Sequence, residues 1–168
     1  MEEQRVYLIA QLDEASGRAL AALYGELSAA GLRGVQTPDF PYHITLGSVG
    51  LPYEKQMLER ARTVCGQMDA FTVPLSHIGL FGLRVLFAAP AANHALIALH
   101  EALIPEGLSE DEYDWVPHAT LLIDEPENIL KAVPIVAASF TPMTAVIDRV
   151  GVYEFPPPRF LACFPLRA

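Results

Sequence analysis

Hydrophobic residues recur along this chain with two different spacings, which predict short strands and amphipathic helices. Residues 6–12 form a short run rich in residues that favour strands. Between residues 14 and 30 the apolar positions lie three or four apart, as they do on one face of a helix. Asp13 is a suitable N-cap for this helix, and Gly31 is a typical residue at its end. The chain therefore begins with a strand followed by a helix.

The same reasoning along the rest of the chain predicts an alternation of strands and helices. The predicted helices cover residues 14–30, 53–68, 91–103 and 126–138. The predicted strands cover residues 6–12, 43–49, 71–81, 84–89, 118–123, 145–155 and 160–166. Pro134 should shorten or kink the last helix, because proline has no backbone N–H to donate. This order of elements predicts an α+β fold.

The tetrapeptide His-x-Thr-Leu occurs twice, each time on a predicted strand. It reads His-Ile-Thr-Leu from His43 and His-Ala-Thr-Leu from His118. Alternate side chains of a strand point to the same face, so His43 should project with Thr45, and His118 with Thr120. Average residue frequencies give two such matches among five histidines by chance on the order of once in a few thousand sequences. The pair therefore indicates two related half-sites.

The elements that follow each motif come in the same order. A helix and then two strands follow each motif strand, and an arginine, Arg84 or Arg159, opens the second of these strands. This order indicates a diverged internal duplication. We therefore expect one domain, residues 1–168, built from two pseudo-symmetric lobes that each carry one motif and face each other across a groove.

The residue types of the motif suit acid–base chemistry on a phosphate ester without a metal. An unperturbed histidine has a pKa near neutrality, so one neutral imidazole can accept a proton from water while a protonated one donates to a leaving oxygen. Threonine hydroxyls can donate hydrogen bonds to the non-bridging phosphate oxygens. The sequence does not say which histidine is the acid and which the base.

The two motifs resemble those of the 2H phosphoesterase superfamily, which includes 2'-5' RNA ligase-like proteins and cyclic nucleotide phosphodiesterases. The resemblance implies a duplicated bilobal α+β fold, with two antiparallel sheets and outer helices facing each other across a central cleft. It also implies metal-independent, cofactor-free chemistry on 2',3'-cyclic phosphates or 2'-5' linkages of nucleotides or RNA ends. His43 and His118 would be the catalytic residues, and Thr45 and Thr120 would bind the substrate.

The charge of the chain narrows the expected substrate. Eleven lysines and arginines stand against 20 acidic residues, which gives a net charge of -9. Because nucleic-acid affinity depends heavily on cationic contacts with phosphates, a small nucleotide or other phosphoester is favoured over a long RNA. Two alternatives remain open: a non-catalytic module that binds nucleotides or RNA ends, and a 2'-5' RNA ligase that runs the reverse reaction.

Other features of the sequence predict where the protein works. The start of the chain lacks the pattern of a signal peptide, and no apolar run is long enough to span a membrane. Cys65 and Cys163 have no C-x-x-C spacing and are expected to be buried, reduced thiols. We therefore expect a cytoplasmic monomer that has no membrane partner.

Several further residues are weaker candidates for the site. A zinc site formed by His43, His118 and His77 is an alternative, although no cysteine or carboxylate accompanies them at a typical spacing. Arg84 is a candidate for phosphate binding, but a structural role is favoured. Phe81 and Trp115 are candidates for stacking on a base, but core packing is favoured for both. Packing or surface roles are expected for the remaining candidates, namely Tyr42, His94 and His100.

Overall fold

A computed structural model of the chain describes residues 3–36, 39–109, 111 and 113–168. The described helices are α1 (Glu14–Ala29), α2 (Glu54–Cys65), α3 (His94–Leu103) and α4 (Pro126–Ser139), and a 3-10 turn, Leu51–Tyr53, precedes α2. The described strands are β1 (Arg5–Leu12), β2 (His43–Gly50), β3 (Phe71–Phe81), β4 (Val85–Pro90), β5 (Ala119–Ile123), β6 (Met143–Phe155) and β7 (Arg159–Pro165). Each predicted helix and strand therefore has a counterpart, with bounds that differ by a few residues.

The bounds of the helices follow from their caps. The carboxylate of Asp13 accepts a hydrogen bond from the backbone N–H of Ser16, as expected of an N-cap. Asn93 caps α3 in the same way, which places the start of that helix after residue 93. Helix α4 continues through Pro134 to Ser139, so the expected shortening is wrong. Pro134 is exposed, so water can donate to the carbonyl oxygen that its missing N–H leaves without a partner.

The strands form a single antiparallel sheet, whereas the sequence led us to expect two sheets. The order is β2-β1-β6-β3-β4-β5, and β7 also pairs with β6. The first parts of β3 and β6 pair with each other, from Phe71 opposite Ile147 to Leu75 opposite Met143. The later part of β3 pairs with β4, and the later part of β6 pairs with β1 on one side and β7 on the other. These two long strands therefore join what would otherwise be two separate sheets.

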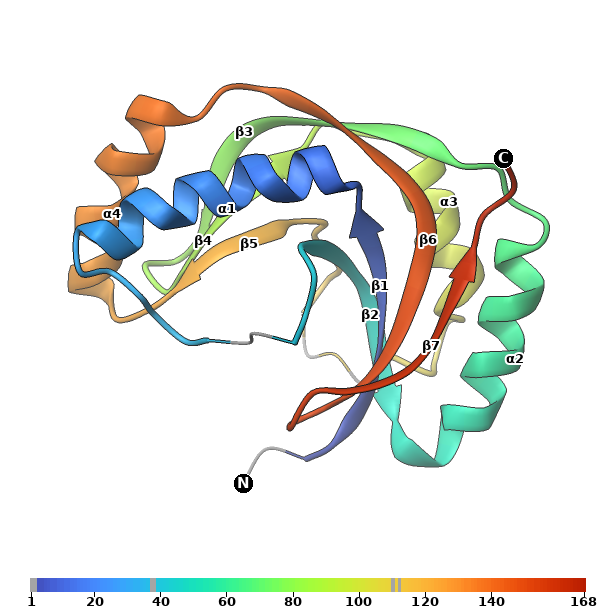
Figure 1. Cartoon of the computed structure of the whole chain (residues 1–168). Helices are drawn as coiled ribbons and strands as arrows, with labels where there is room; N and C mark the ends of the chain where they lie inside the picture. The colour runs from blue at the N-terminus through green and yellow to red at the C-terminus, as the bar shows by residue number, and fades with distance from the viewer. Residues whose placement is uncertain (1–2, 37–38, 110, 112) are drawn as a thin grey trace.

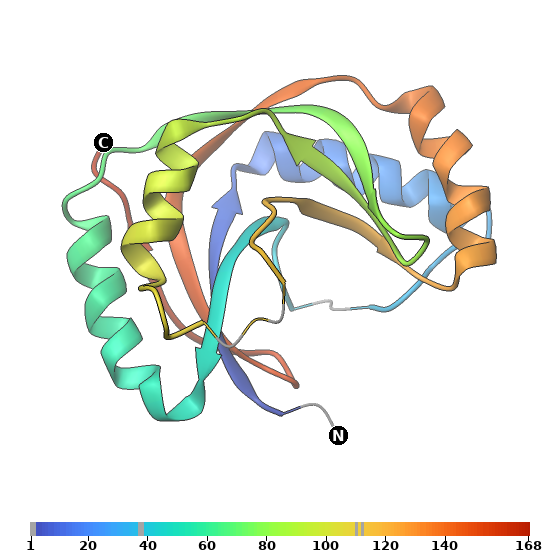
Figure 2. The ribbon, with the colours of Figure 1, turned by 180° about the vertical axis from the view of Figure 1, so that it is seen from behind.

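The sheet is strongly curved, and its two end strands approach each other. Strands β2 and β5 stand at opposite ends of the strand order, yet they lie close together in space (Figure 1 and Figure 2). The helices cover the outside in two pairs: α1 packs with α4, and α2 packs with α3. The α+β architecture expected from the sequence is confirmed, and the curvature brings the two motif strands together.

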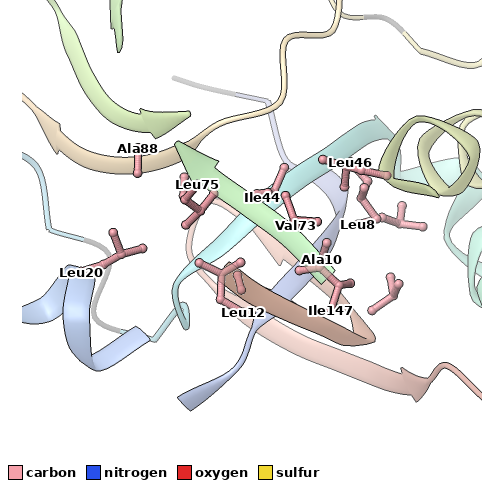
Figure 3. Packing of buried hydrophobic residues seen from close by; sticks show 14 of the residues in the cluster. Leu8, Ala10, Leu12, Leu20, Ile44, Leu46, Val73, Leu75, Ala88 and Ile147 are labelled. Atoms are coloured by element: carbon pink, nitrogen blue, oxygen red, sulfur yellow. The ribbon is translucent and has the colours of Figure 1, made fainter. Parts of the chain in front are cut away.

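The buried side chains of both helix pairs belong to one hydrophobic cluster. Leu20 of α1 and the strand residues Leu8 and Leu75 are part of it (Figure 3), as is Leu99 of α3, and all four are fully buried. Fully burying a leucine is worth roughly 1.5–3 kcal/mol, so this cluster is a large favourable contribution to stability. The core lies on the face of the sheet that the helices cover, and it leaves the opposite face for the motif side chains.

Two further expectations can be compared with the described residues. Cys65 is buried, as expected, but Cys163 is exposed on β7, which corrects the prediction that both thiols are buried. Cys163 pairs with Gly151 of β6. Its neighbour on β7, Phe164, packs against the core, so the side chain of Cys163 points to the opposite face. Among the helices that the structure describes, none is long and apolar enough to cross a membrane.

Candidate active site

The first motif lies at the start of β2, and its side chains alternate between the two faces of the sheet. Ile44 and Leu46 are fully buried in the core, whereas His43 and Thr45 are half-buried on the other face. Strand β1 places Gln11 opposite His43. The expected projection of His43 and Thr45 to a common face is therefore confirmed.

The second motif straddles the start of β5. His118 lies one residue before the strand, which corrects the prediction that the strand includes it, and Thr120 is on the strand. Thr120 pairs with Phe87 of β4, and the ring of Phe87 contacts His118 with a centroid separation of 5.2 Å. His118 and Thr120 therefore lie on the same side of the sheet, while Ala119 between them is fully buried.

Both motifs contain a β-bulge at the same position. In the pairing of β1 with β2, Ile9 faces Thr45 and Leu8 faces Gly47, so Leu46 is the extra residue. In the pairing of β4 with β5, Leu121 is skipped in the same way, directly after Thr120. A bulge bends its strand and changes the direction of the neighbouring side chains. The two half-sites therefore share a backbone irregularity that the sequence repeat did not predict.

The two histidine rings are held in the same way by the backbone. The Nδ1 of His43 lies 2.7 Å from the carbonyl oxygen of Pro41, and the Nδ1 of His118 lies 2.7 Å from that of Val116. A carbonyl oxygen only accepts hydrogen bonds, so Nδ1 is the protonated nitrogen in both rings. This arrangement leaves each Nε2 as the atom that can accept or donate a proton.

Aromatic side chains contact both histidines. Phe40 contacts His43 with a centroid separation of 5.6 Å, and Phe81 contacts His118 edge-on at 4.7 Å. Phe87 also packs on His118, and Gly79 leaves room for it, since a Cβ at Gly79 would come within 2.5 Å of the Phe87 ring. Phe81, considered mainly as a packing residue, thus lies against a motif histidine.

Burial lowers the pKa of both motif histidines below the ordinary value. For His43 the main cause is desolvation, and the positive charge of a protonated His118 lowers its pKa further. For His118 the cause that lowers the pKa is again desolvation. The hydrogen bonds to the backbone carbonyls oppose these shifts but do not cancel them. The effect of His118 on the pKa of His43 also shows that the two rings lie within electrostatic reach.

One cavity is lined by residues of both motifs. It has a volume of about 250 Å³, and His43 from the first motif and Thr120 from the second line it, whereas Thr45 and His118 are not among its lining residues. Tyr24, Gln36 and Phe40 also line this cavity. Side chains from opposite ends of the strand order therefore face one small, partly apolar space that is suited to part of a nucleotide.

Comparison with known proteins identifies the family. The sequence profile described as the 2'-5' RNA ligase superfamily matches residues 13–156, most of the chain. The chain belongs to the 2'-5' RNA ligase superfamily. The resemblance to 2H phosphoesterases inferred from the two motifs is thereby confirmed. A search of curated protein sequences found no match.

Solved structures share the fold of this superfamily member at low sequence identity. LigT of E. coli in complex with phosphate is 20% identical, with a TM-score of 0.68 and full coverage of both chains. TT0787 of Thermus thermophilus is 19% identical, with a TM-score of 0.69 and 98% coverage of both chains. LigT in complex with 3'-AMP is 19% identical, with a TM-score of 0.62 and coverage of 99% of this chain and all of the other.

Two of the remaining candidates, Arg84 and His77, have partners outside the motifs. Arg84 forms an exposed ion pair with Glu125 at 2.7 Å, in line with the structural role that was favoured for it. His77 is exposed, and its Nδ1 lies 2.8 Å from the hydroxyl of the adjacent Ser76. Within the described part of the chain, no three histidine, cysteine or acidic side chains are grouped so that they could hold a metal. The zinc site considered from the sequence therefore has no support in the described residues.

Two residues contact the first motif in a way that sequence reasoning missed. The indole N–H of Trp115 donates to the carbonyl of Thr45 at 2.9 Å, and Nδ1 of His100 donates to that of Leu46 at 2.6 Å. The position of Trp115, three residues before His118, was the only signal in the sequence. His100 carried none, because nothing local indicates that α3 packs against β2.

The lowered pKa values predict the pH dependence of a reaction that needs one neutral and one protonated histidine. Both pKa values lie below 6.5 in the free protein, so the singly protonated pair is most abundant at a pH below 6.5. The profile of kcat/KM reports the free enzyme, and we expect its optimum on the acidic side of pH 6.5. A bound anionic phosphate stabilises a protonated histidine and so raises the histidine pKa values in the complex. The optimum of kcat should therefore lie at higher pH than the optimum of kcat/KM.

Both profiles can be measured with one substrate between about pH 4.5 and 8.5, a range that spans the ordinary titration of histidine. A maximum of kcat/KM above about pH 7.5 would contradict the assignment of these two histidines as the titrating pair. Identical profiles for kcat and kcat/KM would contradict the expected influence of the bound phosphate.

Proposed function

We propose that the protein is a metal-independent phosphoesterase that acts on 2',3'-cyclic phosphates or 2'-5' phosphodiester linkages of nucleotides or RNA ends. The observation that carries this proposal is the matched orientation of the two motif histidines. Each has its Nδ1–H fixed on a backbone carbonyl and its Nε2 left for proton transfer. Two such rings within electrostatic reach of each other provide an acid and a base for one phosphate.

The proposed reaction uses the two rings in opposite protonation states. A neutral Nε2 accepts a proton from water, whose oxygen forms the new bond to phosphorus. The protonated Nε2 of the other histidine donates its proton to the ribose oxygen as the P–O bond breaks. Each such proton transfer contributes roughly 10²–10⁴-fold to the rate. The two residues end with their protonation states exchanged, and a proton exchange with solvent restores them.

The threonine hydroxyls stabilise the charge that the phosphate carries in the transition state. Thr45 shares a face with His43, and Thr120 lines the cavity beside it. Their hydroxyls are suited to donate to the non-bridging oxygens. Cationic groups are not needed for this step, which suits a chain with a net charge of -9.

Structures of relatives support a small phosphorylated substrate. LigT of E. coli has been crystallised with phosphate and with 3'-AMP. The same protein has also been crystallised with ATP and with NADP+. These ligands share a nucleotide or a phosphate group, the chemistry for which the two motifs are suited. A non-catalytic nucleotide-binding module and a ligase running the reverse reaction are the alternative functions.

We also propose that residues 1–168 form one domain of two pseudo-symmetric lobes. The strand order supports this, since β1 lies between β2 and β6 as β4 lies between β5 and β3. The equal bulges after Thr45 and Thr120 support it as well. The equivalent of β4 is then β1, whereas the sequence order matched β4 with β7. Strand β7 would be an addition to this arrangement, paired with β6.

The function is tested by incubating the purified protein with 2',3'-cyclic mononucleotides and with a 2'-5'-linked dinucleotide, with and without EDTA. We expect hydrolysis that EDTA does not reduce, because only side chains carry the chemistry. A long RNA that ends in a 2',3'-cyclic phosphate should react with a lower kcat/KM than the mononucleotide, because the acidic chain repels it. Tight binding without turnover would favour the binding module, and loss of activity in EDTA together with stoichiometric zinc would contradict the metal-free mechanism.

A further inference from the structure

Two ring N–H groups hold the edge of the first motif strand from outside the sheet. Trp115 Nε1 donates to the carbonyl oxygen of Thr45 at 2.9 Å, and His100 Nδ1 donates to that of Leu46 at 2.6 Å. Among the described residues, β2 pairs with β1 alone and is an edge of the sheet. The two acceptors are successive carbonyls at the bulge, where the regular ladder is interrupted. These side chains therefore satisfy backbone groups that strand pairing leaves open.

The two donors form one rigid unit. The rings of His100 and Trp115 are stacked, with centroids 3.9 Å apart and an angle of 3° between their planes. His100 is on α3 and Trp115 is in the segment that leads to β5, so the unit also joins these two parts of the chain. We call Trp115, His100 and their two hydrogen bonds to β2 the ring clamp. Stacking restricts both rings and keeps each N–H directed at its carbonyl.

The ring clamp is a direct link between the two motifs. Trp115 precedes His118 by three residues, and the carbonyl of Val116, between them, accepts the hydrogen bond from His118. No backbone pairing joins β2 to β5 in the part of the chain that the structure describes. A short path therefore runs from Thr45 through Trp115 and Val116 to His118, across a gap that the sheet itself does not close.

We propose that Trp115 and His100 are positioning residues, which fix the separation and orientation of the His43–Thr45 and His118–Thr120 half-sites. This inference rests on the proposed function. Proton transfer and hydrogen bonding to one phosphate require both half-sites to be correctly placed relative to each other. A misplacement of about 1 Å can cost on the order of 10²-fold in rate. Neither ring contacts the substrate in this role; each acts through the backbone of β2.

The first experiment removes only the N–H that links the motifs. Trp115→Phe keeps an aromatic ring for the stack but has no donor for Thr45. We expect kcat to fall about 10-fold while KM changes less than about 3-fold, because the groups that bind substrate remain. The matched control is Arg60→Met. Arg60 Nε donates to the carbonyl of Ala102 at 2.7 Å, which is another long-range side-chain bond to a backbone oxygen, formed between α2 and α3 away from the motifs.

A second pair of variants separates hydrogen bonding from packing at residue 100. His100→Phe keeps the stack and loses the donor, whereas His100→Asn keeps an N–H donor near the position of Nδ1 and loses the stack. The proposal expects His100→Phe to lower kcat about as much as Trp115→Phe, and His100→Asn to recover most of the loss. Equal loss in both variants, in proportion to their loss of thermal stability, would show that only packing matters and would overturn the proposal.

A readout that does not depend on turnover completes the test. Histidine ring resonances can be followed by NMR against pH in the wild type, in Trp115→Phe and in Arg60→Met. We expect the midpoints of His43 and His118 to move in Trp115→Phe and to stay in place in Arg60→Met. Unchanged midpoints and unchanged kcat in Trp115→Phe would overturn the ring clamp. If the wild type hydrolyses none of the substrates, the proposed function fails, whereas the ring clamp is still decided by these midpoints.

Discussion

Replacing His43 or His118 with alanine should lower kcat/KM for a 2',3'-cyclic mononucleotide by about 10²–10⁴-fold, the usual contribution of one general acid or base. Each variant removes one Nε2, the atom proposed to transfer a proton, from a ring that packs against an aromatic side chain, Phe40 at His43 and Phe81 at His118. Steady-state kinetics of the two variants and the wild type measure the effect. Circular dichroism and thermal unfolding confirm that the fold is retained.

His77→Ala is the matched control for these variants. His77 is an exposed histidine on β3 whose ring contacts the hydroxyl of the adjacent Ser76. Its replacement removes an imidazole from the same sheet without touching either motif, and activity should stay within about 2-fold of the wild type. Wild-type activity in both His43→Ala and His118→Ala would contradict the two-histidine mechanism. An effect of His77→Ala as large as theirs would point to a different site.

The double variant His43→Ala/His118→Ala gives a further check. Residues that act as one unit in a reaction have non-additive effects, so the second replacement should cost much less than the first. An additive loss would mean that the two rings act on separate steps or separate sites. Because both rings are proposed to act on one phosphate, the non-additive result is the expected one.

The elements of the fold could be predicted from the sequence because local patterns determine them. The alternation of Ile44 and Leu46 with His43 and Thr45 follows from the strand geometry alone, and it also predicted which side chains share a face. The N-cap at Asp13 was also recognisable, because capping depends on the residue type directly before the helix. The choice of the motif histidines and threonines as the proposed site residues needed nothing beyond spacing and repetition.

The arrangement of the elements depended on long-range contacts that local patterns do not contain. The resemblance to 2H phosphoesterases implied two sheets, but the first parts of β3 and β6 pair and make one. The bulges at Leu46 and Leu121 arise from the register against β1 and β4, so no tetrapeptide could reveal them. His118 falls just outside its strand for a related reason, since the pairing of β5 with β4 ends at Ala119.

The surroundings of the histidines could be predicted least. The contact of Phe40 with His43 joins a loop to a strand, and the hydrogen bond of His100 to Leu46 joins a helix to a strand 54 residues away in sequence. The lowered pKa values of the two motif histidines likewise come mainly from burial, which only the folded chain produces. A sequence motif therefore names the proposed reacting groups, whereas their surroundings have to be taken from the structure.

Replacing Thr45 or Thr120 with valine should lower kcat by about 10²–10³-fold, the usual cost of losing one donor to a developing oxyanion. Valine keeps the β-branched shape that suits a strand, so the change removes the hydroxyl and little else. At Thr45 the backbone carbonyl remains bound to Trp115, which isolates the effect of the side chain. The measurement is kcat and KM of each variant at the pH optimum of the wild type.

Two comparisons make the threonine prediction specific. Thr→Ser at the same positions keeps the hydroxyl and should retain most of the activity, which separates hydrogen bonding from the loss of a methyl group. The pH profile of each valine variant should keep the shape of the wild-type profile, because His43 and His118 still titrate, whereas each histidine variant should lose one limb. Valine variants with full kcat would mean that backbone groups or water hold the phosphate oxygens. The motif would then require threonine for its strand geometry, and the phosphate-binding role would have to be reassigned.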